Sequence, residues 1–454
     1  MLIVGGGEFG STAALALAEG PYRGHGNLIT VLERGAEPPA VDAASSDYNK
    51  IVRADYADPL YQSFAIEAIE QWRTPRWKKH FHECGVVVAA AETDPQAGYV
   101  VNSHRLNKEE DVGRLERAGG IKRFYSASIG TGEFSGDVAY KNKVGGWAAS
   151  RDAVVEAINL ARKLGVTFVS GEAESLIICP GPNGSDVKGV QTVDGREYRA
   201  DFVIVACGSW TPKLLPELAT NCLPTGQTVA TVQLSKEEVE KHKDMPVRLS
   251  VLRDGLTSSS QPNKDGIVKM AIHDRGWLAP SGTFPSLPRT TLSSGYERQQ
   301  IPTVALDTLR RGMRRMHPEL AEKEIVETRL CWYSDRESGD FLFDWHPTYP
   351  SLFVAAGGSG HAFSPSPLLF SFPLPSPSDP PPNAEFLPLT GNWIVSALTR
   401  TLPPHLQRLW SFTTGDKSRL DKSRGEGPIV RRDLDTGVVR EIRVPAAQTV
   451  KAKL

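Results

Sequence analysis

Residues 2–10 read Leu-Ile-Val-Gly-Gly-Gly-Glu-Phe-Gly, and this stretch decides the fold. The apolar triplet is typical of a short buried strand, and residues 11–18, Ser-Thr-Ala-Ala-Leu-Ala-Leu-Ala, are typical of a helix. Between them, Gly5 permits a tight turn, Gly7 lets a pyrophosphate approach the backbone, and Gly10 lets helix and strand pack closely. The strand, the turn and the free N–H groups of the helix together predict a dinucleotide-binding unit.

A second apolar run, at residues 28–32, ends at Glu33. An acidic residue at this place can accept hydrogen bonds from ribose hydroxyl groups. It also disfavours a 2′-phosphate, so NADP is the less favoured dinucleotide. We predict that Glu33 and the adjacent Arg34 contact the cofactor.

The composition favours a protein that handles a small molecule. The chain has 454 residues, of which 40% are hydrophobic, and this length favours two domains. Its formal net charge of -1 provides no electrostatic field that would attract nucleic acid or an anionic membrane. Its five cysteines are odd in number and lack metal-ligand spacing, which favours a reducing compartment and no metal site. No apolar run approaches the roughly 18 residues that span a bilayer.

FAD is favoured over NAD by segments farther along the chain. Residues 202–210 form another apolar run ending in small residues, preceded by a helical pattern at 151–164 and a strand pattern at 166–170. This order resembles the strand that returns to the FAD domain in flavoproteins of the glutathione-reductase type. Residues 171–173 stand where such proteins cover the adenine.

Four further segments carry side chains suited to chemistry. Residues 44–56 contain Lys50 and Arg53, two cations that can stabilise an anionic ring or hold a carboxylate. Residues 269–273 read Lys-Met-Ala-Ile-His, and on a strand the first and last side chains face the same side. The segment from Cys331 to Pro347 and the Gly-rich end of residues 352–363 complete the set.

Together these segments resemble the monomeric sarcosine oxidase family, which includes pipecolate and saccharopine oxidases and fructosyl amino acid oxidases. The resemblance covers about residues 1–412, apart from one insertion. It implies an α/β fold with a discontinuous Rossmann-type FAD-binding domain and a mixed-sheet α+β substrate domain. The expected ranges are 1–80, 145–215 and 335–412 for the first and 81–144 and 216–334 for the second.

The resemblance also implies roles for single residues. Arg53 corresponds to a carboxylate-binding residue, Lys50 to a basic group near the flavin, and Lys269 to the lysine that activates dioxygen. His273 and His361 correspond to histidines near the substrate, and Tyr333 to an active-site tyrosine. Cys331 corresponds to a cysteine joined covalently to the flavin. Further cofactor contacts are expected from Ser46, Gly358 and Gly360.

Each of these assignments has a simpler alternative. Lys50 and Arg53 could lie on an exposed helix, paired with Asp47 or Asp55. The pair Lys269 and His273 could lie on a solvated face, and Cys331 could be a buried small apolar residue.

The chain departs from the family pattern after His361. The family continues with Gly-Phe-Lys-Phe, in which the lysine binds the substrate carboxylate, whereas this chain has a Pro/Ser-rich insertion at residues 364–385. Such a composition does not form a regular element. Since 22 residues replace one lysine, a net gain of the size of a short intron, we hypothesise that the stretch is untranslated in the working enzyme. Sequencing the transcript tests this.

The last three residues, Ala452, Lys453 and Leu454, are a conservative variant of the Ser-Lys-Leu peroxisomal address. The preceding residues, from about 413, are rich in charge, as in an exposed tail that an import receptor could bind. We therefore expect a peroxisomal location, and otherwise a cytoplasmic one.

The expected activity is oxidation of the CH–NH group of a secondary amino acid such as sarcosine, pipecolate or saccharopine. Dioxygen is the expected acceptor, and the expected products are an imine or aldehyde and hydrogen peroxide. One alternative is a deglycating fructosyl amino acid oxidase, favoured by the triplet Asn49-Lys50-Ile51. A second is a flavin-binding protein that the insertion has inactivated.

Overall fold

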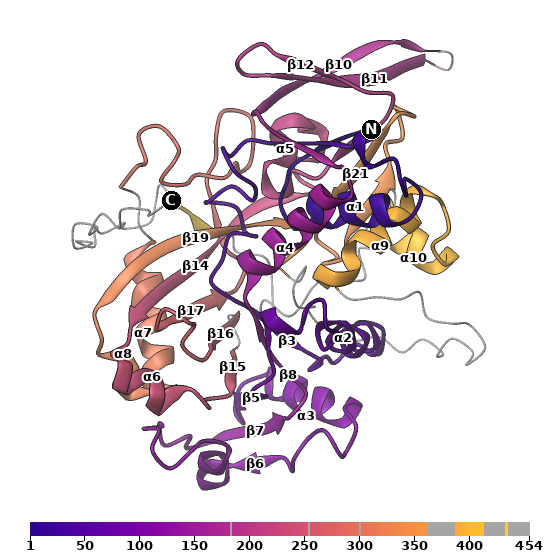
Figure 1. Ribbon diagram of the computed structural model, residues 1–454. Coiled ribbons are helices and arrows are strands. Elements are labelled where there is room, and N and C mark those ends of the chain that lie inside the picture. Colours follow the sequence, from indigo (N-terminus) through magenta and orange to yellow (C-terminus); the bar gives the residue numbers. More distant parts are fainter. Residues whose placement is uncertain (182–183, 253–254, 299–300, 361–385, 413–431, 435–454) are drawn as a thin grey trace.

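The computed structural model describes residues 1–181, 184–252, 255–298, 301–360, 386–412 and 432–434. His361, the insertion at 364–385, the last three residues and most of the tail predicted at 413–454 lie outside the described residues. The chain forms an α/β structure built around two large sheets (Figure 1). This confirms the predicted fold class.

The first sheet has six strands and contains the N-terminus. Its order is β20 (Leu342–Trp345), β21 (Leu352–Ala356), β13 (Val203–Val205), β1 (Leu2–Val4), β2 (Thr30–Glu33) and β9 (Thr167–Ser170). All neighbouring pairs are parallel except β20 with β21. β1 is buried on both faces and lies between β2 and β13, so the fingerprint turn that follows it leaves from the middle of the sheet.

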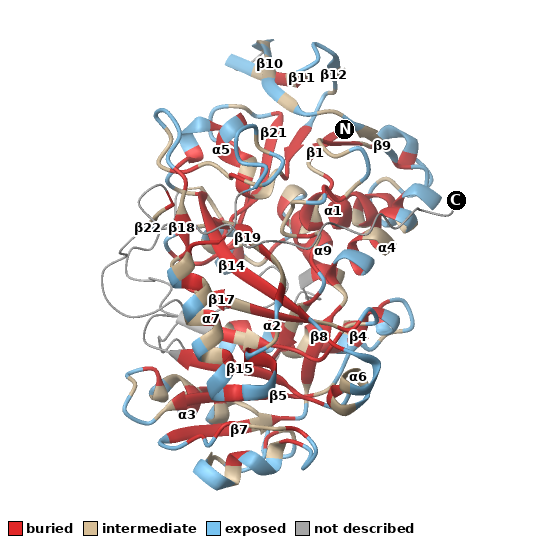
Figure 2. Cartoon of the chain, turned by 90° about the vertical axis from the view of Figure 1, so that its left-hand side faces the viewer, coloured by how far each residue is buried: buried red, intermediate tan, exposed pale blue. Residues whose placement is uncertain are grey.

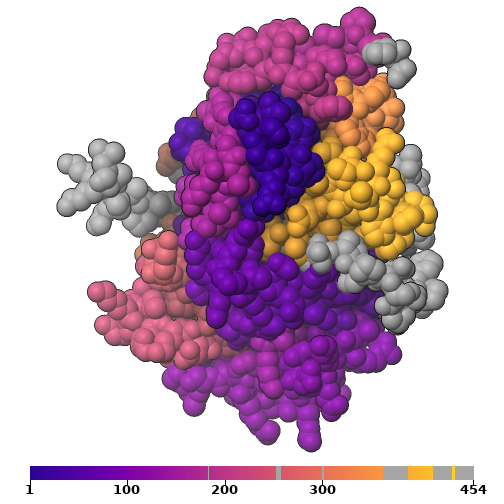
Figure 3. Space-filling model, turned by 45° about the vertical axis from the view of Figure 1, so that its right-hand side comes forward, coloured from indigo at the N-terminus to yellow at the C-terminus, as the bar shows by residue number. Residues whose placement is uncertain are grey.

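Helices cover this sheet. They are α1 (Glu8–Glu19), α2 (Pro59–Trp72), α4 (Ser150–Lys163), α9 (Phe386–Leu398) and α10 (Pro404–Leu409). α1 packs against α4 and against α9, which is far away in the sequence (Figure 3). At the contact with α9, a Cβ on Gly391 would lie 2.1 Å from the carbonyl oxygen of Thr12, so only glycine fits there.

The second sheet has ten strands of mixed direction. Nine follow the order β22 (Arg432–Asp433), β18 (Trp277–Leu278), β14 (Leu223–Gln233), β17 (Ile267–His273), β16 (Gly255–Ser259), β15 (Val247–Leu252), β5 (Val86–Ala91), β7 (Asp137–Asn142) and β6 (Glu116–Arg117). The tenth, β19 (Ile325–Asp335), pairs with β14 along almost its whole length. Helix α7 (Thr303–Met316) packs its apolar side chains against β14 and β17.

Two small sheets complete the structure. β3 (Lys50–Arg53), β8 (Gly145–Ala148) and β4 (Phe81–His82) lie between the large sheets, and β10 (Ala173–Gly181), β11 (Gly184–Thr192) and β12 (Glu197–Arg199) form an antiparallel sheet at one end of the molecule (Figure 1). The strands of the large sheets are mostly buried, whereas this end sheet is largely exposed (Figure 2). The remaining helices are α3 (Ala97–Leu106), α5 (Thr211–Leu214), α6 (Lys236–His242), α8 (Pro318–Ala321), η1 (Gly26–Leu28), η2 (Lys78–His80), η3 (Ala118–Phe124), η4 (Gly208–Trp210) and η5 (Pro216–Leu218).

The strand, turn and helix predicted around the fingerprint are confirmed, although the helix begins three residues earlier than predicted; the strand at 166–170 and the helix at 151–164 are confirmed within one residue, and of the apolar run at 202–210 only Val203–Val205 form a strand. One alternative is wrong: Lys50 and Arg53 lie on strand β3 and not on an exposed helix, and the side chain of Arg53 is buried. Within the described part of the chain, no helix is long and apolar enough to cross a membrane.

Candidate active site

The fingerprint glycines have the geometry that the sequence requires. Gly5 has φ +106°, a conformation that side chains rarely adopt. A Cβ on Gly10 would lie 1.8 Å from the carbonyl oxygen of Gly5, so the close approach of helix and turn depends on glycine. Gly7 precedes α1 without a side-chain cap, which leaves the helix N-terminus open toward the cleft that Gly7 lines.

Glu33 and Arg34, at the end of β2, lie beside this turn. Oε2 of Glu33 accepts a hydrogen bond from the backbone N–H of Gly6 at 2.6 Å. Arg34 pairs with Asp42, and its guanidinium lies 4.0 Å from the ring centre of Trp210. Both side chains therefore have fixed positions at the cleft wall.

An open cleft of about 1230 Å³ runs along the fingerprint turn. Its lining joins four segments that the sequence analysis selected: the turn itself, the end of β2, residues 171–173 and the Gly-rich residues 358 and 360. Ser45 also lines the cleft, and its Oγ accepts a hydrogen bond from the N–H of Glu8 at 2.9 Å. Ser46, the residue predicted to contact the cofactor, lines a different cavity.

A second cavity, of about 810 Å³, adjoins the cleft; we call it the active-site cavity. The two share Lys50, Tyr333 and Gly360 as lining residues. Arg53, Lys269, His273 and Cys331 also line the active-site cavity. The structure thus brings all the predicted catalytic residues together except His361, which lies outside the described residues.

Strands β17 and β19 supply most of these side chains. Lys269, Ala271 and His273 alternate along β17 and line the cavity, which confirms the expectation that Lys269 and His273 face one side. Cys331 and Tyr333 alternate in the same way on β19. The rings of His273 and Tyr333 have centres 5.6 Å apart.

Gly360 closes the cavity beside these two rings. A Cβ at this position would lie 2.2 Å from Cε2 of Tyr333 and 2.7 Å from Cε1 of His273. Gly360 also has φ +76°. Both the backbone conformation and the close approach of the rings therefore require glycine.

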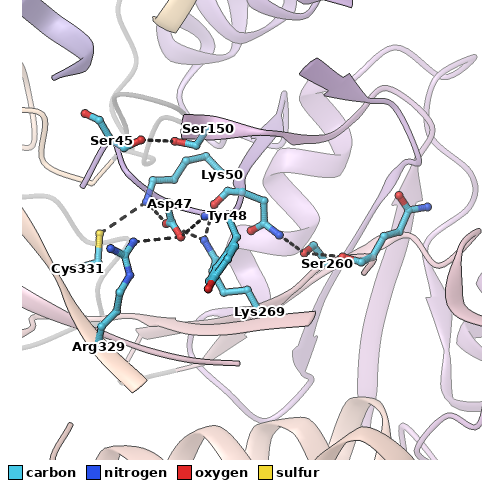
Figure 4. A network of polar contacts seen from close by, with 11 residues as sticks. Ser45, Asp47, Tyr48, Lys50, Ser150, Ser260, Lys269, Arg329 and Cys331 are labelled. Atoms are coloured by element: carbon cyan, nitrogen blue, oxygen red, sulfur yellow. Dashed lines mark hydrogen bonds and ion pairs between the residues drawn. The ribbon is translucent and has the colours of Figure 1, made fainter. Parts of the chain in front are cut away.

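Lys50 and Lys269 meet at the buried carboxylate of Asp47 (Figure 4). Lys269 donates to Oδ2 of Asp47 at 2.9 Å and to the carbonyl oxygen of Asn49. Burial lowers the pKa of Lys269 to about 8, although Asp47 opposes this effect. Burial would also lower the pKa of Lys50, but Asp47 outweighs it and holds that pKa above its ordinary value.

Lys50 also approaches Cys331. Its Nζ lies 3.6 Å from Sγ of this cysteine, whose exposed fraction is 2%. The arrangement therefore places a cysteine beside a cation, next to the place where the cleft and the active-site cavity meet.

Arg53 is held in place by oxygen atoms and by an aromatic ring. Its guanidinium donates to the backbone carbonyl of Asp55 and to the hydroxyl of Tyr99 at 3.0 Å, and it lies 4.6 Å from the ring centre of Tyr56. Burial would lower the pKa of Arg53, but Tyr56, Tyr99 and Asp55 hold it above its ordinary value. A buried, permanent cation on a cavity wall is suited to binding an anionic group.

Three charged residues around the site escaped the sequence analysis. Asp47 had been considered only as the partner of an exposed lysine, and neither Arg329 nor Glu8 had been selected. Arg329 lies two residues before Cys331 and pairs with Asp47 at 3.1 Å. Glu8 lines the cleft, and its burial raises the pKa of its carboxyl to about 8, against the effect of Lys50. The alternation along β19 was the one signal that could have indicated Arg329.

These residues fit a bound dinucleotide. The turn leaves no room for side chains at Gly5 and Gly10, the helix N-terminus is uncapped, and Glu33 is fixed at the cleft wall. The buried Oε1 of Glu8 has no hydrogen-bond partner among the described residues, so a polar ligand in the cleft could satisfy it. Among the described residues, no group of three or more His, Cys, Asp or Glu side chains could hold a metal ion.

Comparisons with known proteins agree with this geometry. L-Saccharopine oxidase from Schizosaccharomyces pombe is 28% identical over 92% of this chain and 94% of that protein. Monomeric sarcosine oxidase from a Bacillus species is 22% identical over 80% of this chain and 88% of that protein. The crystal structure of the deglycating enzyme fructosamine oxidase from Aspergillus fumigatus matches with a TM-score of 0.78 at 26% identity, covering 96% of this chain and 95% of that one. The model of the FAD dependent oxidoreductase (DAO) family matches residues 1–369, and the chain belongs to this family.

Proposed function

We propose that this protein is an FAD-dependent oxidase that acts on the CH–NH group of a secondary amino acid and passes the electrons to dioxygen. The observation that carries the proposal is the active-site cavity, in which Arg53, Lys269 and His273 adjoin the end of the dinucleotide cleft. Bound FAD would take the two electrons and two hydrogens of the CH–NH group, leaving a C=N bond, and would pass them to dioxygen as hydrogen peroxide. The imine that leaves is hydrolysed by water.

Arg53 supports an amino-acid type of substrate. Its buried guanidinium is suited to binding a substrate carboxylate, and a carboxylate held there would fix the orientation of the amine. His273 and Tyr333 lie side by side on the wall of the same cavity, as groups that orient the amine. The predicted role of His361 remains part of the proposal.

Lys269 supports dioxygen as the acceptor. Its pKa of about 8 leaves most of the amine protonated at neutral pH, and a fixed positive charge stabilises negative charge that develops on oxygen. Lys50 would act near the ring, where a cation stabilises the reduced cofactor. The remaining predicted contacts of FAD, at Glu33, Arg34, Gly358 and Gly360, all line the cleft.

We further propose that Cys331 holds FAD covalently. Forming a thioether from a thiol and a ring methyl group removes two hydrogen atoms, which dioxygen can accept as hydrogen peroxide. The position of Cys331 supports this proposal, because its sulfur lies 3.6 Å from Nζ of Lys50, a residue that lines both the cleft and the active-site cavity. In the same scheme, the six-stranded sheet forms the FAD-binding domain and the ten-stranded sheet the substrate domain, with the boundaries predicted from sequence.

The relatives support three substrate types. A saccharopine-like substrate is supported by the 28% identity to L-saccharopine oxidase, and the fold likeness to fructosamine oxidase supports the deglycating alternative.

The peroxisomal proposal rests on the terminal Ala-Lys-Leu, and one relative is the peroxisomal sarcosine oxidase of mouse, at 22% identity. The inactive flavin-binding alternative rests on the insertion that replaces the family's lysine.

The first experiment is an absorption spectrum of protein made from a transcript-verified clone, before and after acid precipitation. Yellow colour that stays with the pellet supports FAD bound covalently through Cys331, and colour released to the supernatant contradicts the covalent link. A peroxide assay with sarcosine, pipecolate, saccharopine and fructosyl amino acids then tests the activity. A yellow protein that gives no peroxide with any of these amines contradicts the oxidase proposal and favours the inactive alternative.

A further inference from the structure

A third and larger cavity lies on the other side of Asp47. It encloses about 2700 Å³ and is open to solvent; we call it the outer cavity. Tyr48, Arg151, Asp152, Glu327 and Arg329 are among its lining residues. Among the lining residues of the outer cavity and the active-site cavity, only Asp47 lines both.

The carboxylate of Asp47 is fully buried and joins groups on both sides (Figure 4). Oδ2 accepts hydrogen bonds from Lys50 and Lys269, which face the active-site cavity. Oδ1 pairs with Arg329 at 3.1 Å and accepts the backbone N–H of Tyr48 at 2.9 Å, on the side of the outer cavity. With these four contacts the carboxylate has one orientation.

The charges of this cluster are unbalanced. Three cations surround one carboxylate, and their attraction outweighs burial and holds the pKa of Asp47 far below its ordinary value. Of the three, Lys269 is the one whose pKa burial brings near neutrality, to about 8. Glu327 also acts on Arg329, whereas Asp47 is the carboxylate that acts on Lys269, so the lysine with the lowest pKa depends on it.

The groups that face Lys269 come from three directions. Asp47 precedes β3, Lys50 lies on β3, and Cys331 lies on the neighbouring β19. Of the strands that flank β17, β14 places Thr231 opposite Lys269, and β16 ends with Ser259 opposite Met270; neither side chain carries a charge. Asp47 is therefore the only carboxylate among the groups that act on Lys269 in the described part of the chain.

We propose that Asp47 is a positioning residue of the dioxygen step: it keeps Lys269 in the ammonium form and aimed at the active-site cavity, while Arg329 secures the carboxylate from the outer cavity. This inference rests on the proposed oxidase function. Asp47 acts through Lys269 and touches neither substrate nor dioxygen. The assignment extends the site by two residues, Asp47 and Arg329, that no sequence motif had selected.

The test measures the dioxygen step without any amine. The flavin of the purified holoenzyme is reduced with dithionite under anaerobic conditions and mixed with dioxygen, and its reoxidation is followed by absorbance from pH 6 to 10. Sulfite affinity over the same pH range is an equilibrium readout, because a nearby cation stabilises the sulfite adduct of flavin.

In Asp47→Asn, Lys269 loses its counter-ion and deprotonates at lower pH. We expect reoxidation at pH 8 to slow at least about tenfold, because one unit of pKa changes the ammonium fraction by up to that factor. The pH above which the rate and the sulfite affinity fall should move down by at least about one unit. A purely structural role would change flavin content and leave this pH dependence in place.

Arg329→Gln should act in the opposite direction. Without the arginine, Asp47 interacts with two lysines only, so the pH at which the rate and the sulfite affinity fall should move up. Asp152→Asn is the matched control, because it removes the same charge from a carboxylate that lines the outer cavity, is half exposed and pairs with Lys264. Its pH dependence should equal that of the unchanged protein.

An Asp47→Asn protein with full flavin content and the pH dependence of the unchanged protein would overturn the proposal. If that variant loses its flavin, Arg329→Gln decides the question. If the pH above which its reoxidation rate and sulfite affinity fall is unchanged or lower, the proposal is overturned; if that pH is higher, the proposal is supported. If the unchanged protein reoxidises no faster than free reduced FAD, the oxidase function itself fails, and the proposal for Asp47 fails with it.

Discussion

Asp47 and Asp55 lie on either side of strand β3, and both side chains are almost fully shielded from solvent. Around Asp47 are three cations, which hold its pKa far below the ordinary value in spite of burial. Around Asp55 the donors to the carboxylate are neutral, Tyr140 at 2.8 Å and Asn142 at 3.0 Å, and burial raises its pKa. Burial is alike at the two ends, so the charge of the neighbours decides whether a carboxylate there is ionised.

The two ends of β3 also differ in how the aspartate interacts with the neighbouring cations. At Asp47 the lysines are neutralised in part and fixed in place by the carboxylate itself. At Asp55 the guanidinium of Arg53 donates to the backbone carbonyl, and Arg53 lines the active-site cavity. The end of β3 near Asp47 is thus suited to fix the two lysines, and the end near Asp55 places Arg53 on the wall of the active-site cavity.

The largest expected effect is on stability at the Asp47 end. Asp47→Asn leaves Lys50, Lys269 and Arg329 buried without their counter-ion, and it should lower the free energy of unfolding by about 3–5 kcal/mol at pH 7. Because the folded pKa is depressed, the stabilisation is present above the unfolded pKa of about 3.9 and is lost as pH falls below it. Urea denaturation of both proteins at pH 7 measures the destabilisation, and the same experiment at pH 3 measures how much of it is lost at low pH. A variant as stable as the unchanged protein at pH 7 contradicts the ion-pair interpretation.

Arg53→Gln should reduce kcat/KM by about 100-fold for an amine that bears a carboxylate, because a buried charge pair lost on one side costs on the order of 3 kcal/mol. An analogous amine without the carboxylate should lose much less. Steady-state peroxide assays with the two amines make the comparison. Equal losses with both would show that Arg53 supports the cavity and does not bind the carboxylate.

Tyr140→Phe removes one of the two neutral donors to Asp55 and should cost about 1–1.5 kcal/mol of unfolding free energy. The hydroxyl also lies 2.7 Å from Oγ of Ser103, which would lose the same partner. Combining this change with Asp55→Asn gives a double-mutant cycle that isolates the pair. Additive losses would contradict a direct interaction between Tyr140 and Asp55.

The smallest effect is expected for Asp55→Asn, within about 1 kcal/mol at pH 7, because an amide resembles the neutral acid. The folded pKa is raised, so the stability that the proton confers is present below the unfolded pKa of about 3.9 and is lost as pH rises toward the folded value. Urea denaturation from pH 4 to 9 should show this decline in the unchanged protein and not in the variant. A decline of the same size in both would assign it to another group.

The sequence predicted those parts of the site that depend on spacing. Gly5 and Gly10 could be assigned because a turn and a close approach leave glycine as the one residue that fits, and Lys269 with His273 because side chains alternate along a strand. The roles of Asp47 and Arg329 could not be predicted, because the sequence does not show that a lysine at position 50 and one at 269 share a buried carboxylate. For the same reason Ser46 was predicted to contact the cofactor, whereas Ser45 lines the cleft. In a loop, side chains do not alternate regularly, so the sequence does not show which of them points toward the cleft.

Strand β19 places side chains on two sides in strict turn. Its odd positions, Arg329, Cys331 and Tyr333, supply polar side chains to the cavities, whereas Leu330 and Trp332 at its even positions belong to the hydrophobic core, although Leu330 also lines the outer cavity and Trp332 the cleft. Deleting one residue early in this strand would exchange the two sets, bringing a leucine and a tryptophan to the flavin and an arginine to the core. This strand can therefore change by substitution but not by a change of length.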